Sequence, residues 1–401
     1  MAVVITSIKV RSPLGCTLEE CMKNIELGKR CISTIENFNT AGFQTTAAGE
    51  IRCNGKVVIT EPNIDRKNFF LDQITTELRN STSFDKKYNP SEIAMNIGSG
   101  LDYVDIENLY KNREFTYPKT AHLPSHYKSN KQITEIAAKN NIKGGCNVFV
   151  AACAASTQAI GLSYKMVNRG IKEAVITGGA DSMVNQINYL GFYNLGAMAT
   201  AKEGEAPYIC KPFDKNRSGT ILGEGAIVML LENSKKVKQE KIIAQIAGYA
   251  STMDAYAVTD PDPSAKSLAR AISNALKSAS ITPEMIDCVH LHGTGTYKNA
   301  PAEYKALAQI FKERVKELPV YSLKGQIGHM IGSCGAMEML GVIYSIQNQV
   351  VLPTINFSEQ DPHAPLYVIK EKPLSIPINY ILKLNSSFGG ENTALIIKKY
   401  E

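Results

Sequence analysis

Cys153 occupies a position where a thiol could act as a nucleophile. It lies in V-F-V-A-A-C-A-A-S-T-Q-A-I-G, between a predicted strand at 147–150 and a predicted helix at 156–169. Its neighbours are small, so a substrate could approach the sulfur closely. The first turn of a helix also presents unpaired N–H groups that stabilise a thiolate or a developing oxyanion. Cysteine is equally common as a buried apolar residue, so a structural role stays open on this pattern alone.

Two histidines lie among glycines in the second half of the chain. His292 opens H-G-T-G-T at the end of a predicted strand, which is where α/β proteins place ligands, and His329 lies in K-G-Q-I-G-H-M-I-G. Histidine can exchange a proton near neutral pH, so both are candidate catalytic residues. We interpret the remaining histidines as structural: His122, His126, His290 and His363.

Charged and glycine-rich segments surround these histidines. Lys324 precedes His329 by five positions and Glu338 follows it by nine, so the two could form an ion pair that orients the site. The tail S-S-F-G-G-E-N-T could supply backbone N–H groups to an oxyanion. The glycines of G-T-I-L-G-E-G-A at 219–226 lack the spacing and the Gly-Lys-Ser/Thr ending of nucleotide sites, so nucleotide binding is not expected.

The composition is that of a globular protein with a large core. Of 401 residues, 44% are hydrophobic, and 44 Lys plus Arg against 38 Asp plus Glu give a formal charge of +6. A nucleic-acid binder concentrates far more positive charge, so we expect no nucleic-acid partner, whereas an acidic protein partner is compatible with the charge. No long uncharged apolar run predicts a membrane span, and the first residues, M-A-V-V-I-T-S-I-K, indicate a strand instead of a secretion signal.

The nine cysteines form no recognisable framework. Their number is odd and they contain no C-x-x-C pair, which argues against a set of disulfides and against a thiolate zinc site. A reducing cytoplasm is therefore the expected location.

Short apolar runs alternate with longer helical patterns, which indicates an α/β sheet with helices on its faces. A polar region at 102–145 is interpreted as an insertion of loops and helices. Strands are predicted at 3–8, 93–97, 147–150, 174–177, 226–232, 243–249, 288–291, 320–322 and 393–398. Helices are predicted at 17–27, 156–169, 264–278, 302–311 and 336–347.

The two halves of the chain are alike in outline. In the first, a strand runs into A-A-C-A-A-S and then a helix; in the second, a strand runs into H-G-T-G-T and then a helix. This favours a duplicated α/β unit with a boundary near 235–245, at K-K-V-K-Q-E-K. We assign 1–240 to an N-terminal half and 241–401 to a C-terminal half.

The whole chain carries segments in the order typical of one family. They are S-P-L-G, A-A-C-A-A-S-T-Q-A-I-G, V-I-T-G-G-A-D, C-K-P-F-D-K-N-R-S-G-T-I-L-G-E-G-A, H-L-H-G-T-G-T, L-K-G-Q-I-G-H-M-I-G-S-C-G-A-M-E and N-S-S-F-G-G-E-N. Together they resemble the β-ketoacyl-acyl-carrier-protein synthases. These are the decarboxylating condensing enzymes of the thiolase superfamily, and the chain is most similar to type II elongating enzymes and bacterial polyketide ketosynthases.

The resemblance implies a role for each candidate residue. It places the nucleophile on Cys153 and the histidine pair on His292 and His329. The family's lysine falls on Lys324, and its buried glutamate partner falls on Glu338. Further roles are implied for Phe388 (gate and, with Cys153, oxyanion hole), Thr294 and Thr296 (pantetheine arm) and Phe192 (end of the acyl pocket).

Fold and partners follow from the same resemblance. It implies a five-layer αβαβα thiolase-like fold built from two duplicated halves, in a homodimer or, as in some polyketide systems, a heterodimer. The partner would be an acyl carrier protein bearing acyl and malonyl groups on phosphopantetheine. Arg66 and Lys67 would lie on the basic helix that receives it, with Lys119 and Lys128 as weaker candidates.

The implied reaction is a decarboxylative Claisen condensation that needs no metal or other cofactor. Cys153 takes the acyl group from a carrier thioester. His292 and His329 donate hydrogen bonds to the carbonyl oxygen of the malonyl thioester, so that the enolate left by loss of CO₂ is stabilised. The carbanion attacks the acyl group on Cys153 and gives a β-ketoacyl carrier protein.

Several positions depart from the family pattern. Ala300 stands where an acidic residue is usual, and Ser386, followed by Ser387, stands where the closing turn usually has an aromatic residue. These departures favour an unusual substrate, so a specialised polyketide pathway is as compatible as fatty-acid elongation.

Three other readings are open. A chain-length-factor-like subunit, or a scaffold that only binds the carrier, would lack turnover. Cys153, His292, Lys324 and His329 all being present argues against both. A thiolase would need a second cysteine near the C-terminus, and the closing turn has none.

Overall fold

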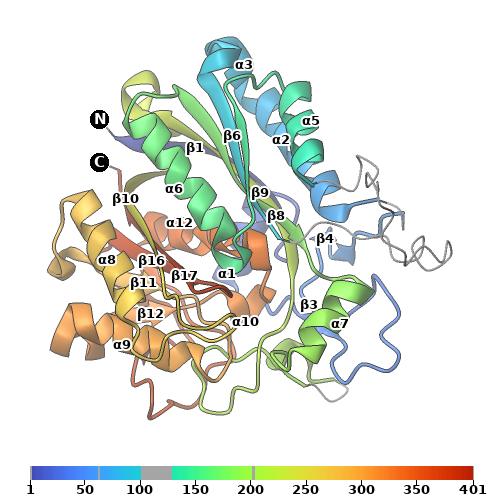
Figure 1. Cartoon of the computed structure of the whole chain (residues 1–401), viewed down its shortest axis with the longest axis vertical. Coiled ribbons are helices and arrows are strands. Elements are labelled where there is room, and N and C mark those ends of the chain that lie inside the picture. The colour runs from blue at the N-terminus through green and yellow to red at the C-terminus, as the bar shows by residue number, and fades with distance from the viewer. Residues whose placement is uncertain (1, 62–63, 101–128, 201–203, 401) are drawn as a thin grey trace.

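One eleven-stranded sheet runs through the part of the chain that the computed structural model describes, residues 2–61, 64–100, 129–200 and 204–400 (Figure 1). Its first-half strands are β1 (Val3–Arg11), β6 (Ile93–Ser99), β7 (Cys146–Phe149), β8 (Ala174–Ser182) and β9 (Glu224–Asn233). Its second-half strands are β10 (Ala244–Met253), β11 (Cys288–His290), β12 (Pro319–Tyr321), β14 (Tyr367–Val368), β16 (Tyr380–Ser386) and β17 (Glu391–Lys398). Small two-stranded sheets pair β2 (Ser33–Thr34) with β3 (Ala47–Ala48), β4 (Arg52–Cys53) with β5 (Lys56–Val57), and β13 (Val350–Val351) with β15 (Leu374–Ser375).

Both halves of the sheet have the same strand order. Apart from β14, which extends the second half beyond β12, the first runs β7-β6-β8-β9-β1 and the second β12-β11-β16-β17-β10. If these five strands of each half are numbered along the chain, both halves have the order 3-2-4-5-1. In each half the fifth strand is antiparallel to its two neighbours, whereas the second strand is parallel to both of its neighbours. The halves join where β1 pairs with β10. The repeated order supports the proposed duplication, whose dividing line between β9 and β10 stays a prediction.

Helices cover the sheet in layers, as Figure 1 shows. The outer layer of the first half contains α2 (Arg66–Thr82) and α5 (Ser129–Lys139), and that of the second contains α8 (Lys266–Ala279) and α9 (Asn299–Phe311). Between the two half-sheets lie α6 (Ala155–Asn168), α11 (Cys334–Met337) and α12 (Met339–Asn348), in the largest apolar cluster of the described residues. The other α-helices of the described residues are α1 (Leu18–Glu26), α3 (Phe84–Lys87), α7 (Gln186–Asn194) and α10 (Lys324–Ile327).

The five-layer αβαβα prediction is therefore confirmed. Each outer helical layer shares its own apolar cluster with one half-sheet, and the central helices share a third cluster with both. A strand buried on both faces has no polar side, which is why β6, β8 and β9 carry near-continuous apolar residues.

Most predicted elements are present, with three informative differences. Strand β16 was missed because Lys383 and Asn385 interrupt its apolar run. The helix predicted at 336–347 is divided at Glu338 into α11 and α12. Helix α9 begins at Asn299, before the predicted residue 302.

Of the polar region 102–145, the structure describes the part from residue 129 onward, which contains α5 and the approach to β7. Lys119, Lys128, His122 and His126 lie outside the described residues. Among the described helices, none combines the length and the apolar character needed to cross a bilayer.

One pair of cysteines corrects the expectation of no disulfide. Cys16 and Cys53 are bonded, with their Cα atoms 5.2 Å apart. The chain returns from the turn after β1 to the hairpin of β4 and β5, which brings together two cysteines 37 positions apart. The other seven cysteines are free.

The prediction that Arg66 and Lys67 receive a carrier protein stays a prediction, and in the structure neither side chain is exposed. Both are buried, with 8% and 3% of their surface exposed. The Arg66 guanidinium forms an ion pair with the fully buried carboxylate of Glu224, and its Nε donates to Glu224 Oε2 at 3.0 Å. The first turn of α2 faces the sheet, so the charge of Arg66 is neutralised inside the protein by Glu224.

We expect Arg66→Met to destabilise the protein strongly, because it leaves the Glu224 carboxylate buried without its cation. Removing one partner of a buried pair costs about 3–5 kcal/mol in the free energy of unfolding. Urea unfolding followed by circular dichroism measures the change. Lys139→Met, which removes an exposed ion pair with Asp72, is the control and should leave the unfolding curve unchanged. Equal curves for the two variants would contradict the role given to Arg66.

Candidate active site

Cys153 lies in a tight turn between β7 and α6. The turn is a short 3₁₀ segment, Ala152–Ala154, which runs directly into α6. Ala152 has a φ of +44°, a left-handed conformation that is strained for a residue with a Cβ. This sharp change of direction leaves Cys153 5% exposed, at the floor of a cavity.

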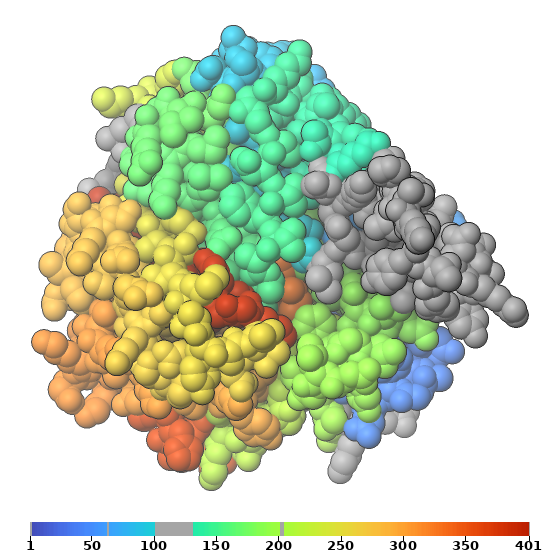
Figure 2. All heavy atoms as spheres, viewed as in Figure 1, coloured from blue at the N-terminus to red at the C-terminus, as the bar shows by residue number. Residues whose placement is uncertain are grey.

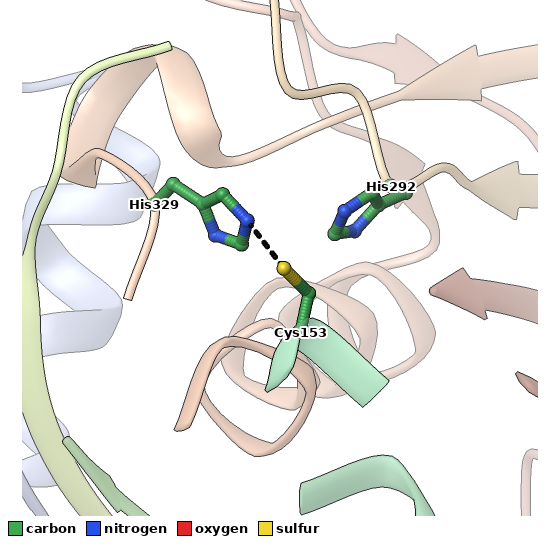
Figure 3. A group of neighbouring side chains, drawn as sticks. All are labelled: Cys153, His292 and His329. Carbon is green, nitrogen blue, oxygen red and sulfur yellow. Dashed lines mark hydrogen bonds between the residues drawn. The ribbon is translucent and has the colours of Figure 1, made fainter. Parts of the chain in front are cut away.

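His329 contacts the Cys153 sulfur. Its Nε2 lies 3.0 Å from Sγ, as the dashed line in Figure 3 shows. The backbone holds the residue on both sides, because His329 N donates to Ile221 O at 2.6 Å and Gly223 N donates to His329 O at 2.9 Å. Ile331, two positions on, has a φ of +40° and lines the same cavity. Backbone strain thus occurs beside both partners of this contact.

His292 faces the same sulfur from the opposite side (Figure 3). Its ring is 5.2 Å from that of His329, centre to centre, with an interplanar angle of 82°. The residue follows β11, and the buried carboxylate of Glu303 on α9 accepts hydrogen bonds from the backbone N of His292 at 2.6 Å and of Gly293 at 3.0 Å. Glu303 was missed in the sequence, although its place in Y-K-N-A-P-A-E, after the H-G-T-G-T turn, is a possible signal.

Lys324 and Glu338 form the ion pair that the sequence predicts. The Lys324 ammonium donates to Glu338 and, at 2.6 Å, to His292 O. Its Nζ also lies 3.2 Å from His292 Nδ1. Burial opposes the charge of Lys324, but the attraction of Glu338 raises its pKa overall. Burial also opposes the charge of Glu338, yet Lys324 and Lys383 hold the pKa of that carboxyl far below its ordinary value.

Two further buried polar residues extend this network. Asn385 Nδ2 lies 3.0 Å from His292 Nδ1 and donates to Glu338 Oε2 at 2.8 Å. Lys383 Nζ lies 3.1 Å from the same Glu338 oxygen. Sequence reasoning missed both as site residues, although a lysine inside the apolar run I-L-K-L is a signal that could have been used.

The two histidines differ in what surrounds Nδ1. His292 Nδ1 faces two donors, Lys324 Nζ and Asn385 Nδ2, so it must accept and the ring proton must lie on Nε2. His329 Nδ1 is buried and has no hydrogen-bond partner among the described residues. His292 is therefore held as a donor toward the cavity, whereas nothing in the described residues fixes the tautomer of His329.

The electrostatics of the free site favour a neutral thiol and neutral imidazoles. Burial raises the pKa of the Cys153 thiol to about 12, and the positive charge of Lys324 only partly opposes this. The predicted stabilisation of the thiolate at a helix N-terminus is thus outweighed by burial. Burial, reinforced by Lys324, lowers the pKa values of His292 and His329 well below the ordinary value. A neutral His329 ring beside Sγ can take the thiol proton when a substrate arrives.

A narrow cavity of about 80 Å³ leads to these three residues. Phe388 and Phe192 both line it and stack with ring centres 6.4 Å apart. Thr294 and Thr296 also line it, with their hydroxyl oxygens 2.8 Å apart. In Figure 2 the red C-terminal segment surfaces between yellow and green segments, and residues from all three of these parts of the chain line the cavity. The structure thus brings the predicted substrate-contacting residues to one channel.

Among the described residues, two sets of atoms have the spacing of a metal site. In Cys153, His292 and His329, one sulfur and two nitrogens lie within 4.8 Å of one another. In His292, Cys334 and Glu338, one nitrogen, one sulfur and one carboxylate oxygen lie within the same distance. In each set a member is already engaged, His329 with the Cys153 sulfur and Glu338 with Lys324. The arrangement is better described as a hydrogen-bonded network around a thiol, and the absence of a metal stays a prediction.

Comparison with family models identifies both halves of the chain. Residues 1–237 match the N-terminal domain of β-ketoacyl synthases, and residues 243–358 match the C-terminal domain.

Individual relatives agree over the full length. The chain is 28% identical to a 3-oxoacyl-acyl-carrier-protein synthase 2 of Synechocystis, covering 100% of this chain and 98% of the relative. It is 30% identical to the enzyme of the same name from Staphylococcus aureus, again over 100% and 98%.

Solved structures give the same result. A β-ketoacyl synthase from Burkholderia phymatum superposes with a TM-score of 0.87 at 26% identity, with both chains covered completely. A type II polyketide ketosynthase, solved with its acyl carrier protein and bound to a hexaketide, gives 0.88 at 25% identity, over 100% of this chain and 99% of the other.

Proposed function

Because the chain belongs to the β-ketoacyl synthase family, we propose that Cys153, His292 and His329 carry its reaction. The chain is an acyltransferase that forms β-ketoacyl chains by condensation in fatty-acid or polyketide synthesis. The observation that supports this assignment is the 3.0 Å contact between Cys153 Sγ and His329 Nε2, with the His292 ring opposite and a cavity leading to all three. A chain-length-factor role is disfavoured because the nucleophile and both imidazoles are assembled.

The first half-reaction is acyl transfer to Cys153. Sγ attacks the thioester carbonyl of the incoming acyl group while His329 Nε2 accepts the thiol proton. His329 then passes this proton to the departing pantetheine thiolate. The backbone N–H groups of Cys153 and Phe388 are the candidates for holding the tetrahedral oxyanion. The product is an acyl thioester on Cys153 and a free carrier thiol.

The second half-reaction is condensation with a malonyl thioester. The bond from the malonyl α-carbon to its carboxylate breaks, CO₂ leaves, and the electron pair forms an enolate. His292 Nε2–H donates to the enolate oxygen, and His329 can join it as the Nε2–H tautomer. The carbanion then forms a bond to the acyl carbonyl carbon, and the Cys153 thiolate leaves.

An acyl carrier protein is the proposed source of both substrates. The type II polyketide ketosynthase to which this chain is similar was solved with such a partner. Here the stacked pair Phe388 and Phe192 lies along the cavity, and the hydroxyls of Thr294 and Thr296 offer hydrogen bonds to the amide groups of a pantetheine arm. Because Phe388 is 36% exposed, it is suited to gate this entrance.

We further propose a homodimer through the edge of the sheet at β7. Among the described residues β7 pairs only with β6, so its other edge is open to a second strand. Val150, immediately after β7, is apolar and 64% exposed. Pairing of β7 with the same strand of a second copy would give a symmetric interface close to Cys153.

Cys153→Ala should abolish acyl loading, because no other group in the cavity can form the thioester. We expect the covalent acyl adduct seen by mass spectrometry to vanish and condensation to fall by on the order of 10⁴-fold or more. Decarboxylation of the malonyl thioester should continue, since both histidines remain. Cys146→Ala, which removes another free thiol, is the matched control. Native loading by Cys153→Ala would refute the assignment.

His292→Ala should separate the two half-reactions. It removes a donor to the enolate but no contact to the sulfur, so malonyl decarboxylation should fall about 10²–10³-fold while acyl loading changes by less than about tenfold. Radiolabelled CO₂ release and adduct formation measure the two steps. The exposed His363→Ala is the control. If both steps fell equally in His292→Ala, the specific role of His292 in decarboxylation would be wrong.

Val150→Asp should weaken the proposed dimer, because pairing would bury a carboxylate without a partner. Sedimentation velocity over a dilution series should show dissociation at a concentration about tenfold or more above that of the unsubstituted protein. Leu27→Asp, at an apolar position that is 67% exposed at the end of α1, is the control. A monomeric unsubstituted protein, or the same behaviour in both variants, would count against the β7 interface.

A further inference from the structure

A second lysine is buried behind His292 and has no part in the mechanism above. Lys383 lies in the middle of β16 and is 0% exposed. Its Nζ meets three acceptors: Glu338 Oε2 at 3.1 Å, Thr157 Oγ1 at 3.3 Å and Asn385 Oδ1. An ammonium has three N–H bonds whereas a neutral amine has two, so this environment matches the charged form.

The charges of Lys383, Lys324 and Glu338 do not cancel. Lys324 binds one oxygen of Glu338 and Lys383 approaches the other, so two ammonium groups share one carboxylate in the interior. Burial lowers the pKa of Lys383, and Glu338 only partly offsets this. A single lysine would suffice to neutralise Glu338, and a buried unbalanced cation is costly. The second cation therefore calls for an explanation beyond stability.

Asn385 connects Lys383 to His292. Its carbonyl oxygen accepts from Lys383 and from the Thr157 hydroxyl at 2.6 Å. Its amide nitrogen consequently points the other way, toward Glu338 Oε2 at 2.8 Å and His292 Nδ1 at 3.0 Å. The amide thus presents N–H to the imidazole nitrogen that must remain unprotonated.

We propose that Lys383 is a positioning residue that, through Asn385 and through its own charge, holds His292 neutral with its proton on Nε2. The proposal deepens the proposed function, because that tautomer is the one that donates to the enolate oxygen.

The sign of the effect follows from the groups that face His292. Positive charge comes from Lys324 on α10 and Lys383 on β16, and negative charge from Glu338 between α11 and α12. The other titratable neighbours are His329, Cys153, Cys334 and Glu303. Each nearby cation disfavours a charged imidazole, so removal of Lys383 should raise the pKa of His292.

The experiment is a pH titration of ¹⁵N-histidine-labelled protein with Lys383→Met, followed by NMR, with His292→Ala to assign the signal. In the unsubstituted protein His292 should show the Nε2–H tautomer at neutral pH and resist protonation on acidification. In Lys383→Met its pKa should rise by about one unit, because a nearby charge is lost. An unchanged pKa and tautomer would overturn the proposal.

Activity gives a second readout that a structural role would not move. Since His292 must be neutral to act, the acid limb of the malonyl decarboxylation profile should shift to higher pH by the same amount in Lys383→Met. A general loss of packing would instead lower the rate evenly at all pH values and would contradict the proposal. Lys87→Met, which removes a lysine paired with the buried Glu232 elsewhere, should leave the profile in place.

Lys383→Gln keeps the test decisive if Lys383→Met fails to fold. Glutamine has a similar reach and can still bond to Asn385 and Glu338, but it carries no charge. It should raise the pKa of His292 as well, and a native value would refute the electrostatic part of the role. The NMR titration needs no substrate, so a failure of the proposed function in His292→Ala would be distinguishable from a failure of this inference.

Discussion

The buried carboxylate of Glu338 is the constraint on which the site depends. It lies between α11 and α12, in the central layer between the two half-sheets, where an unpaired charge would be very unfavourable. It must therefore gather donors, and those donors come from α10 and from β16. Because two of these donors, Lys324 and Asn385, also contact His292, satisfying one buried charge fixes the geometry of an imidazole on a different element. The arrangement of the residues around His292 is thus a consequence of how the interior satisfies a buried carboxylate.

This constraint makes the two histidines unequal. His292 is surrounded by donors at Nδ1 and anchored by Glu303 through its backbone, so its tautomer is set before any substrate arrives. His329 is held by its backbone and by the contact of Nε2 with the Cys153 sulfur, and its Nδ1 has no partner within the described residues. A histidine that serves both an acyl transfer and a decarboxylation needs to accept a proton in one step and donate in the other. The less constrained ring is the one beside the sulfur, and in the mechanism proposed above it is the ring that makes this change.

Burial also explains why charges were harder to interpret than apolar residues. A basic dipeptide such as Arg66-Lys67 has the composition of a docking surface. The first turn of α2 nevertheless faces the sheet, where Arg66 pairs with Glu224 at the start of β9. Lys383 shows the same effect inside the site. In both cases an acidic partner more than forty positions away in the chain decides whether the cation serves the interior or a protein partner.

The sequence alone was sufficient for the fold class, for the candidate nucleophile and histidines, and for the Lys324–Glu338 pair, because each follows from local pattern or from segments in a characteristic order. It was also sufficient for most strands, since apolar runs bounded by glycine turns are local signals. Tertiary structure alone decided that α2 turns its basic residues inward, that Cys16 meets Cys53, that Asn385 reaches His292 and that Lys383 reaches Glu338. The reason is physical: apolar periodicity is carried by neighbours in the chain, whereas the partner of a buried polar group is chosen by packing between distant elements.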